Sequence, residues 1–317
     1  MSSKLEKQKQ LLNEELEEIL TPLCNTTDLF ELIRNILMVE GRDPTSTNSQ
    51  KPWPLLPLVV ADSISGNCEH VVPAAAAIQL LMAAGDVFDD IEDSDVSDSI
   101  SSKYGTAIAA NTGTTLLILA EKALTRLNNR GINNETTLRV IEKINSFFTN
   151  ACIGQHLDLS LARSVLNEGQ YLDIVKLKSA SQIECCCHAG AALSTIDNMV
   201  VDLFSVFGQN LGIMAQFSND IVGVITKKDI IRRKPTLPMF FGFSHSDDKS
   251  RSILEKAFNP SCLNEVSTDQ VKNVLFSSGG IQYTSLKMSF HRELAKETHY
   301  ALEHRGISVR QLMEFLN

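Results

Sequence analysis

The feature that most constrains this chain is an apolar run, Val71 to Ala84, that passes directly into a densely acidic segment. Six of the ten residues from 86 to 95 are acidic. On an α-helix, residues three and four apart share a face, so Asp86, Asp89 and Asp93 line up. Clustered carboxylates repel one another unless solvent or cations compensate, and their hard oxygens suit Mg²⁺, which commonly bridges to substrate phosphates. The segment therefore predicts either a solvated acidic helix end or a magnesium site that takes a phosphorylated substrate.

Hydrophobic residues recur with a helical spacing along almost the whole chain, and no segment shows the alternation typical of a strand. The chain has 317 residues, of which 43% are hydrophobic and 21% are charged, as in ordinary globular proteins. We therefore predict one all-α domain over residues 1–317, with roughly ten to twelve helices. N-terminal helices and a loop would occupy residues 1–55, the core 56–243, and C-terminal helices 244–317.

Net charge and cysteine usage argue against several classes of protein. A net charge of −9 argues against a general nucleic-acid-binding surface. Three of the seven cysteines are consecutive, Cys185 to Cys187, and adjacent thiols make poor disulfide partners, so we expect a cytoplasmic protein. Residues 1–18 resemble a charged amphipathic helix rather than a secretion signal. The most apolar windows, 71–84 and 108–120, are too short to span a bilayer, so we expect no transmembrane segment.

Polar groups also interrupt the later apolar helices. Five of the eight residues from 227 to 234 are basic, which makes a local positive loop on an acidic protein. Each group has an ordinary alternative: a surface patch, a surface lysine, a helix terminus or a solvated loop. The candidates are Gln155, Asp158, Lys178, Gln216, Asn219, Asp220, Lys228 and Lys234.

The order of these groups is more specific than any one of them. A DDxxD motif, then GQxxDL, a Lys-Ser helix, Gln-x-x-Asn-Asp and K-D-x-x-x-x-K-x-T-L-P resembles the trans-isoprenyl diphosphate synthase family over about residues 56–243. The resemblance implies an isoprenoid-synthase bundle of helices around an apolar cavity, and a homodimer. It also implies two or three Mg²⁺ ions that bind with the diphosphate of an allylic prenyl substrate.

The resemblance also implies roles for individual residues. The implied metal ligands are Asp89, Asp90 and Asp93 in the first motif, with Asn219 and Asp220 in the second. The implied diphosphate lysines are Lys178, Lys228 and Lys234, and the implied polar cavity residues are Gln155, Asp158 and Gln216. The catalytic set is then Asp89, Asp90, Asp93, Lys178 and Asp220.

Departures from the family pattern narrow the expected reaction. Synthases that add isopentenyl diphosphate carry a G-K-R-x-R-P stretch, whereas this chain keeps only Lys51 there and lacks both arginines. They also carry basic residues soon after DDxxD, and residues 94–102 contain none. A second diphosphate needs cationic partners, so we infer that isopentenyl diphosphate is not the normal co-substrate. Gly223 also stands where a metal-ligand aspartate would be.

Two groups of relatives share this loss. ComQ-like prenyltransferases transfer a prenyl group to a tryptophan of a peptide, and terpene synthases cyclise a single allylic diphosphate. A peptide or small-molecule acceptor and cyclisation thus both stay open, with chain elongation or a non-catalytic partner subunit as lesser alternatives. Ala83, Ala84 and Gly85 are small at the implied cavity floor, so a chain of fifteen carbons or longer is expected. Phe88 either lines the upper cavity or packs in the core.

Overall fold

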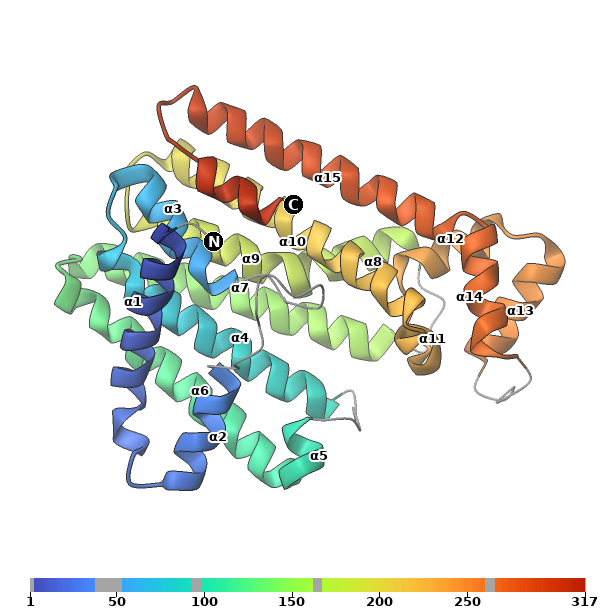
Figure 1. Cartoon of the computed structure of the whole chain (residues 1–317), viewed down its shortest axis with the longest axis horizontal. Coiled ribbons are helices and arrows are strands. Elements are labelled where there is room, and N and C mark those ends of the chain that lie inside the picture. Colours follow the sequence, from blue (N-terminus) through green and yellow to red (C-terminus); the bar gives the residue numbers. More distant parts are fainter. Residues whose placement is uncertain (1–2, 38–52, 93–98, 162–166, 260–265, 317) are drawn as a thin grey trace. The chain divides into compact units, whose positions relative to one another are not determined.

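A computed structural model describes residues 3–37, 53–92, 99–161, 167–259 and 266–316 of the chain. Among these residues there are fifteen α-helices and no β-strand, so the predicted all-α fold is confirmed (Figure 1). The α-helices are α1 (Ser3–Leu20), α2 (Thr27–Leu37), α3 (Leu56–Ser65), α4 (Val72–Glu92), α5 (Ile100–Tyr104), α6 (Thr106–Thr125), α7 (Asn134–Leu161), α8 (Glu168–Val175), α9 (Ser181–Ala192), α10 (Asn198–Ile225), α11 (Lys228–Arg232), α12 (Leu237–His245), α13 (Asp248–Phe258), α14 (Thr268–Ser277) and α15 (Gly280–Glu303). The count exceeds ten to twelve because elements such as α5 and α11, with five residues each, are too short to show a periodic pattern.

The helices group into two compact units. Unit 1 comprises Met1–Thr149, Gln182–Gly208 and Thr298–Asn317, and unit 2 comprises Asn150–Ser181 and Gln209–Glu297. Helices α7, α10 and α15 each contribute residues to both units. The expectation of one domain over the whole chain stays a prediction.

Helix α4 is the central element of unit 1. Its alanine-rich first half has high helix propensity and small side chains, and Ala74 to Ala77 are completely buried. Small side chains let a neighbouring helix approach closely, and α6 packs along α4 (Figure 1). This packing holds the acidic end of α4, which carries Asp89 and Asp90.

The helix that contains α4 is longer than the apolar window of residues 71–84. The helical segment Glu69–Glu92 is 24 residues long, enough to cross a membrane by length and composition. The helix extends beyond residues 71–84 at both ends, so its length alone does not exclude a membrane span, and the expectation of no transmembrane segment stays a prediction. Its most apolar window is 72% buried within the protein, as in the core helix of a globular domain.

An ion-pair cluster fixes α1 within unit 1. Glu15 is almost completely buried, and its carboxylate accepts from Arg126 Nε at 2.5 Å and from a terminal nitrogen of Arg130 at 2.7 Å. Both arginines lie in the 3₁₀ turn Arg126–Arg130, which follows α6. A buried carboxylate is stable only when such donors satisfy it, so this cluster specifies where α1 packs.

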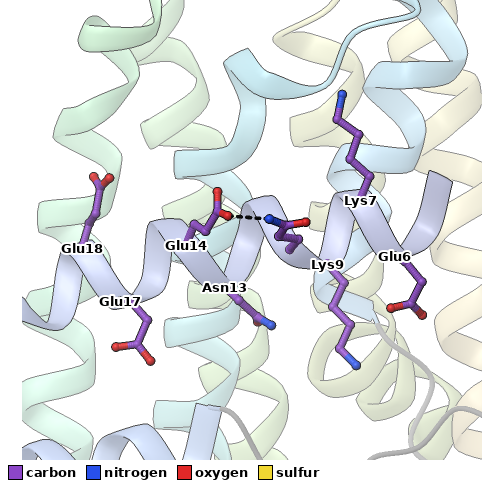
Figure 2. A pocket seen from close by; sticks show the side chains of 8 residues that line it. Glu6, Lys7, Lys9, Asn13, Glu14, Glu17 and Glu18 are labelled. Atoms are coloured by element: carbon purple, nitrogen blue, oxygen red, sulfur yellow. Dashed lines mark hydrogen bonds between the residues drawn. The ribbon is translucent and has the colours of Figure 1, made fainter. Parts of the chain in front are cut away.

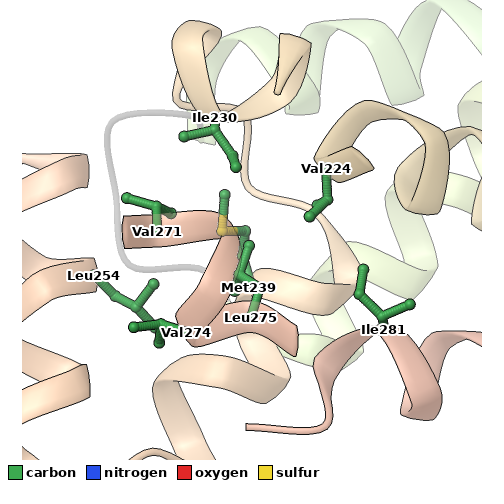
Figure 3. Close-up of a cluster of buried hydrophobic side chains, with 8 residues drawn as sticks. All are labelled: Val224, Ile230, Met239, Leu254, Val271, Val274, Leu275 and Ile281. Atoms are coloured by element: carbon green, nitrogen blue, oxygen red, sulfur yellow. The ribbon is translucent and has the colours of Figure 1, made fainter. Parts of the chain in front are cut away.

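Two apolar clusters build unit 2. One joins the end of α10 to α11, α12, α13, α14 and the start of α15, and Figure 3 shows its side chains gathered around Met239. Its buried members are Val224, Ile230, Met239, Leu254, Val271, Val274, Leu275 and Ile281. The other lies beside the polar groups of this unit and contains Tyr171, Val175, Ala180, Ile213, Phe217 and Leu237.

Candidate active site

The acidic end of α4 places Asp89 and Asp90 in its last turn, both half-buried, with Asp86 exposed one turn earlier. Asp93 and Lys51 lie outside the described residues. Within the described part of the chain, no three His, Cys, Asp or Glu side chains converge as a ready metal cage. Two carboxylates on one helix end fit the way Mg²⁺ is usually held, by one or two protein carboxylates together with substrate phosphate and water.

The small residues Ala84 and Gly85, which precede the acidic end of α4, differ in their surroundings. Ala84 is completely buried, whereas a Cβ atom added to Gly85 would meet no heavy atom within 4 Å. Gly85 is exposed, so the space beside it is open to solvent, and the predicted cavity floor stays a prediction. A Cβ on Gly113 of α6 would lie 2.7 Å from Phe88 Cζ, so the Phe88 ring packs against the backbone of α6. This geometry favours the core-packing role of Phe88 over the cavity-lining role.

Lys178 lies in a short π-helical segment, Lys176–Ala180, between α8 and α9. A Cβ on Gly154 of α7 would lie 2.8 Å from Lys178 Cα, and a Cβ on Gly212 of α10 would lie 2.5 Å from Ala180 Cα. The segment is therefore packed against the bare backbone of two helices. Lys178 Nζ contacts Asp158 Oδ2 at 2.9 Å, with both side chains about one-fifth exposed. Two of the predicted motifs thus meet in space, and π segments are frequent at functional sites.

Asp220 is the centre of a buried hydrogen-bond network. Tyr171 Oη and the Leu237 backbone N–H donate to Asp220 Oδ2, and Gln216 Nε2 donates to Asp220 Oδ1 at 2.9 Å. Ser179 Oγ donates to Gln216 Oε1 at 2.7 Å, which links the network to the residue beside Lys178. Asp220 thereby joins α8, α10 and the first residue of α12 to the π segment.

Burial raises the pKa of the Asp220 carboxyl to about 6, although the hydrogen bonds from Tyr171 and Gln216 oppose this shift. Burial and the charge of Asp220 in turn raise the pKa of Tyr171 well above its ordinary value. Both oxygens of Asp220 accept hydrogen bonds, so the carboxylate orients three helices whether or not it also binds a metal. Its role as a metal ligand stays a prediction. Tyr171 was missed from the sequence because its partner lies 49 residues away.

A carboxylate from another helix lies beside the second motif, which begins at Asn219 and Asp220 and has Gly223 at its next acidic position. Asn219 is exposed on α10, and Gly223 lies one turn further along the same helix. A Cβ on Gly223 would lie 2.8 Å from Asp229 Oδ1 and closer still to Oδ2. The Asp229 carboxylate, from α11, therefore occupies the space that a side chain at position 223 would need. Spacing along one helix could not reveal an acid that arrives from the next one.

Basic side chains surround this carboxylate. Burial raises the pKa of Asp229, and the charges of Lys234, Arg232 and Lys228 oppose that shift. Lys228 is exposed and Lys234 is half-buried. The expected positive loop of residues 227–234 is wrong in detail, because the helix α11 covers Lys228–Arg232.

A groove on the exposed surface of α1 does not coincide with the predicted site. Figure 2 shows its charged and amide side chains, with Gln10 Nε2 donating to Glu14 Oε1 at 2.8 Å. It is lined by Glu6, Lys7, Lys9, Gln10, Asn13, Glu14, Glu17 and Glu18. A groove lined only by charged and amide side chains does not suit a prenyl chain.

Comparison with known proteins gives a consistent picture. A family model described as polyprenyl synthetase matches residues 48–275. The tryptophan prenyltransferase ComQ of Bacillus spizizenii is 27% identical over 237 residues, covering 73% of this chain and 81% of that protein. A geranylgeranyl diphosphate synthase of Methanosarcina mazei is 24% identical over 221 residues, covering 68% of this chain and 64% of that protein.

Similarity also extends to solved structures. The crystal structure of a geranylgeranyl pyrophosphate synthetase from Pyrococcus horikoshii matches with a TM-score of 0.82 and 22% identity, covering 93% of this chain and 90% of that chain. This likeness confirms the helical fold that the order of the motifs predicted.

Proposed function

The chain belongs to the polyprenyl synthetase family and is an enzyme of prenyl transfer. We propose that it ionises an allylic prenyl diphosphate of fifteen carbons or longer and transfers the prenyl group to an acceptor other than isopentenyl diphosphate. The observation that carries the proposal is the arrangement around Lys178, where the ion pair with Asp158 and the Ser179–Gln216–Asp220 hydrogen bonds converge. Such an arrangement holds an ammonium group in a defined position, which supports the proposal that Lys178 binds a diphosphate.

The proposed reaction breaks the bond between C1 of the prenyl chain and the diphosphate oxygen, and the electron pair leaves with pyrophosphate. The allylic cation is then attacked at C1 by the acceptor, which loses a proton. Ammonium groups of Lys178, Lys228 and Lys234 stabilise the negative charge that develops on the leaving group. Gln155, Asp158 and Gln216 orient these donors, and apolar surroundings keep water from the cation.

Magnesium is the cofactor of this proposal, and two or three ions would neutralise the diphosphate as its bond to carbon breaks. Asp89 and Asp90, with Asp93 next in the motif, would hold it at the first motif. Asn219 and Asp220 would serve at the second. The hard oxygen donors of these side chains fit a metal that binds together with phosphate.

The acceptor is inferred from what the sequence lacks. Without the family's arginines near Lys51 and with no basic residue in 94–102, a second diphosphate has few cationic partners. The match to a tryptophan prenyltransferase supports an acceptor of indole or peptide chemistry. We further propose a cytoplasmic homodimer.

One experiment tests this function. The purified protein with Mg²⁺ is incubated with allylic diphosphates of ten, fifteen and twenty carbons, each with and without a tryptophan-containing peptide or isopentenyl diphosphate. We expect pyrophosphate release that depends on the peptide, with a prenylated peptide in the mass spectrum. The variant Asp89→Asn should lose turnover, while Asp86→Asn, one turn earlier and exposed, should retain it.

Other products would assign other functions. A cyclic hydrocarbon from a single diphosphate would replace transfer by cyclisation. A longer diphosphate, formed only with isopentenyl diphosphate, would contradict the inference from the missing arginines. No turnover with any substrate, and no change with Asp89→Asn, would indicate a partner subunit without catalysis.

A further inference from the structure

Arg233 has an unfavourable backbone conformation for a residue with a side chain. Its φ of 55° lies in the left-handed region, and it caps the C-terminal end of α11. Glycine is the usual residue at such a position because a Cβ atom makes this conformation costly. Among the described residues, the only other non-glycine with positive φ is Lys227, with φ 65°, at the opposite end of α11.

Lys227 has a visible compensation for its strain. Its Nζ forms an ion pair with Asp269 Oδ1 of α14 at 2.7 Å. Arg233 has none: although it is half-buried, its guanidinium makes no hydrogen bond or ion pair with any residue in the described ranges. Asp229, four residues earlier in the chain, already feels the charges of Lys234, Arg232 and Lys228. Arg233 therefore adds a cation that forms no ion pair with an acidic side chain of the described residues.

We propose that Arg233 is a substrate-binding residue that contacts the diphosphate of the prenyl substrate beside Lys234. A guanidinium presents a planar fork of donors that matches two phosphate oxygens at once, which a lysine cannot do. Strained residues persist where the side chain has a function, and a diphosphate supplies the negative charge that the protein does not. The inference rests on the proposed function, because it takes the diphosphate of that reaction as the ligand.

The test separates stability from binding. Affinity for inorganic pyrophosphate with excess Mg²⁺ is measured by calorimetry, and the melting temperature is measured without ligand, for the wild type and Arg233→Gly. Glycine relieves the backbone strain, so the melting temperature should rise by roughly 2 °C. Loss of a charge-assisted contact should at the same time weaken pyrophosphate binding about tenfold or more. A residue with a purely structural role would not move the two quantities in opposite directions.

Two further variants serve as controls. Arg233→Lys keeps the charge and should retain part of the affinity. Lys227→Gly is the matched change at the other strained end of α11, and it should leave pyrophosphate affinity within about twofold. Affinity of Arg233→Gly within twofold of the wild type would overturn the proposal, as would an equal loss in Lys227→Gly.

Failure of the underlying function has a different signature. If wild-type protein binds no Mg²⁺–pyrophosphate, the proposed function and this role of Arg233 both fail. If wild type binds and Lys178→Ala weakens binding, but Arg233→Gly does not, only the role of Arg233 fails.

Discussion

At the scale of single residues, the carboxylate of Asp229 lies against the backbone of Gly223 and leaves no room for a side chain there. Replacing Gly223 with aspartate would restore the acidic motif in the sequence. It would also force the new carboxylate into the space that the Asp229 carboxylate occupies. We expect Gly223→Asp to lower the free energy of unfolding by about 2 kcal/mol or more. Chemical denaturation measures this change.

A second-site variant provides the control for that change. The double variant Gly223→Asp with Asp229→Ala removes the competing carboxylate and should recover most of the lost stability. If Gly223→Asp alone unfolds like the wild type, the close approach of Asp229 to Gly223 is not a constraint.

Buried histidines make stability depend on pH. Burial lowers the pKa of His70, His188 and His291 from the ordinary value of 6.5, so the unfolded chain binds protons more readily than the folded chain. Their contribution is fully present above pH 6.5 and is lost as the pH falls below it. Asp220 acts in the opposite direction, because its raised pKa of about 6 makes its ionised form costly above that pH.

His291 gives a single-site test of this pH dependence. Its Nδ1 contacts Asn210 Oδ1 at 2.8 Å, and its ring packs edge-on against Phe217. We expect the melting temperature of the wild type to fall from pH 7.5 to pH 5.5, and to fall less steeply in His291→Gln. An unchanged slope in the variant would mean that His291 is equally basic in both states.

At the scale of elements, the π segment that carries Lys178 depends on two glycines. Gly154→Ala adds a methyl group against Lys178 Cα, and we expect it to lower the free energy of unfolding by about 1–3 kcal/mol despite the better helix propensity of alanine. Gly85→Ala is the matched control in α4, where the added methyl meets no atom within 4 Å, and it should stabilise by roughly 0.5–1 kcal/mol. Thermal melts of both variants measure these changes in stability. A shift of the melting temperature in the same direction in both variants would contradict the prediction.

Packing of α1 depends on its one buried acid. Glu15→Gln leaves Arg126 and Arg130 without their buried partner, and we expect a loss of about 2 kcal/mol in the free energy of unfolding. Glu17 lies on the same helix as Glu15 and forms an exposed ion pair with Arg34 of α2. The variant Glu17→Gln removes this pair and should change the free energy of unfolding by less than about 0.5 kcal/mol. Equal effects in urea denaturation would show that burial of Glu15 does not matter.

Long elements could be predicted from the sequence, and short ones could not. The spacing of apolar residues in the sequence predicts helices over 135–161 and 281–304, and α7 and α15 match these ranges within one residue at each end. Helix α11 shows no periodic pattern of apolar residues. Its five residues are bounded instead by left-handed backbone conformations at Lys227 and Arg233. Lys178 was predicted on a helix, but the π turn around it depends on contacts with Gly154 and Gly212, which lie far away in the chain.

At the scale of the whole molecule, α6 exposes apolar side chains that the single chain leaves uncovered. Ile118 is 66% exposed, and Ile108 and Leu117 are also exposed on this helix. A helix that is apolar on both sides is usually buried on both, so we expect a homodimer with twice the 35.0 kDa chain mass. Light scattering after size-exclusion chromatography measures the mass, and Ile118→Glu should shift it toward the monomer. A monomeric wild type would contradict the prediction.

The order of polar motifs along the chain predicted the fold, because the same order brings the same helices together. It also predicted that Asp158 and Lys178 belong to one site; the two side chains form an ion pair, and their joint role in a site stays a prediction. It could not predict Tyr171 or Asp229 as partners of that region, because each contact depends on tertiary packing rather than on local spacing.

The backbone contacts at Gly154 and Gly212 have a consequence for how this protein tolerates mutation. A segment held by the absence of two side chains is disturbed by every missense change at either position, since each one adds atoms. In a saturation mutagenesis screen, we expect nearly every substitution at Gly154 or Gly212 to reduce the amount of folded protein. Cys152 and Ile153, exposed on the same helix just before Gly154, should accept most substitutions. Random libraries for new acceptors can therefore vary exposed positions of α7 such as 152 and 153 while keeping the codons for Gly154 and Gly212 fixed.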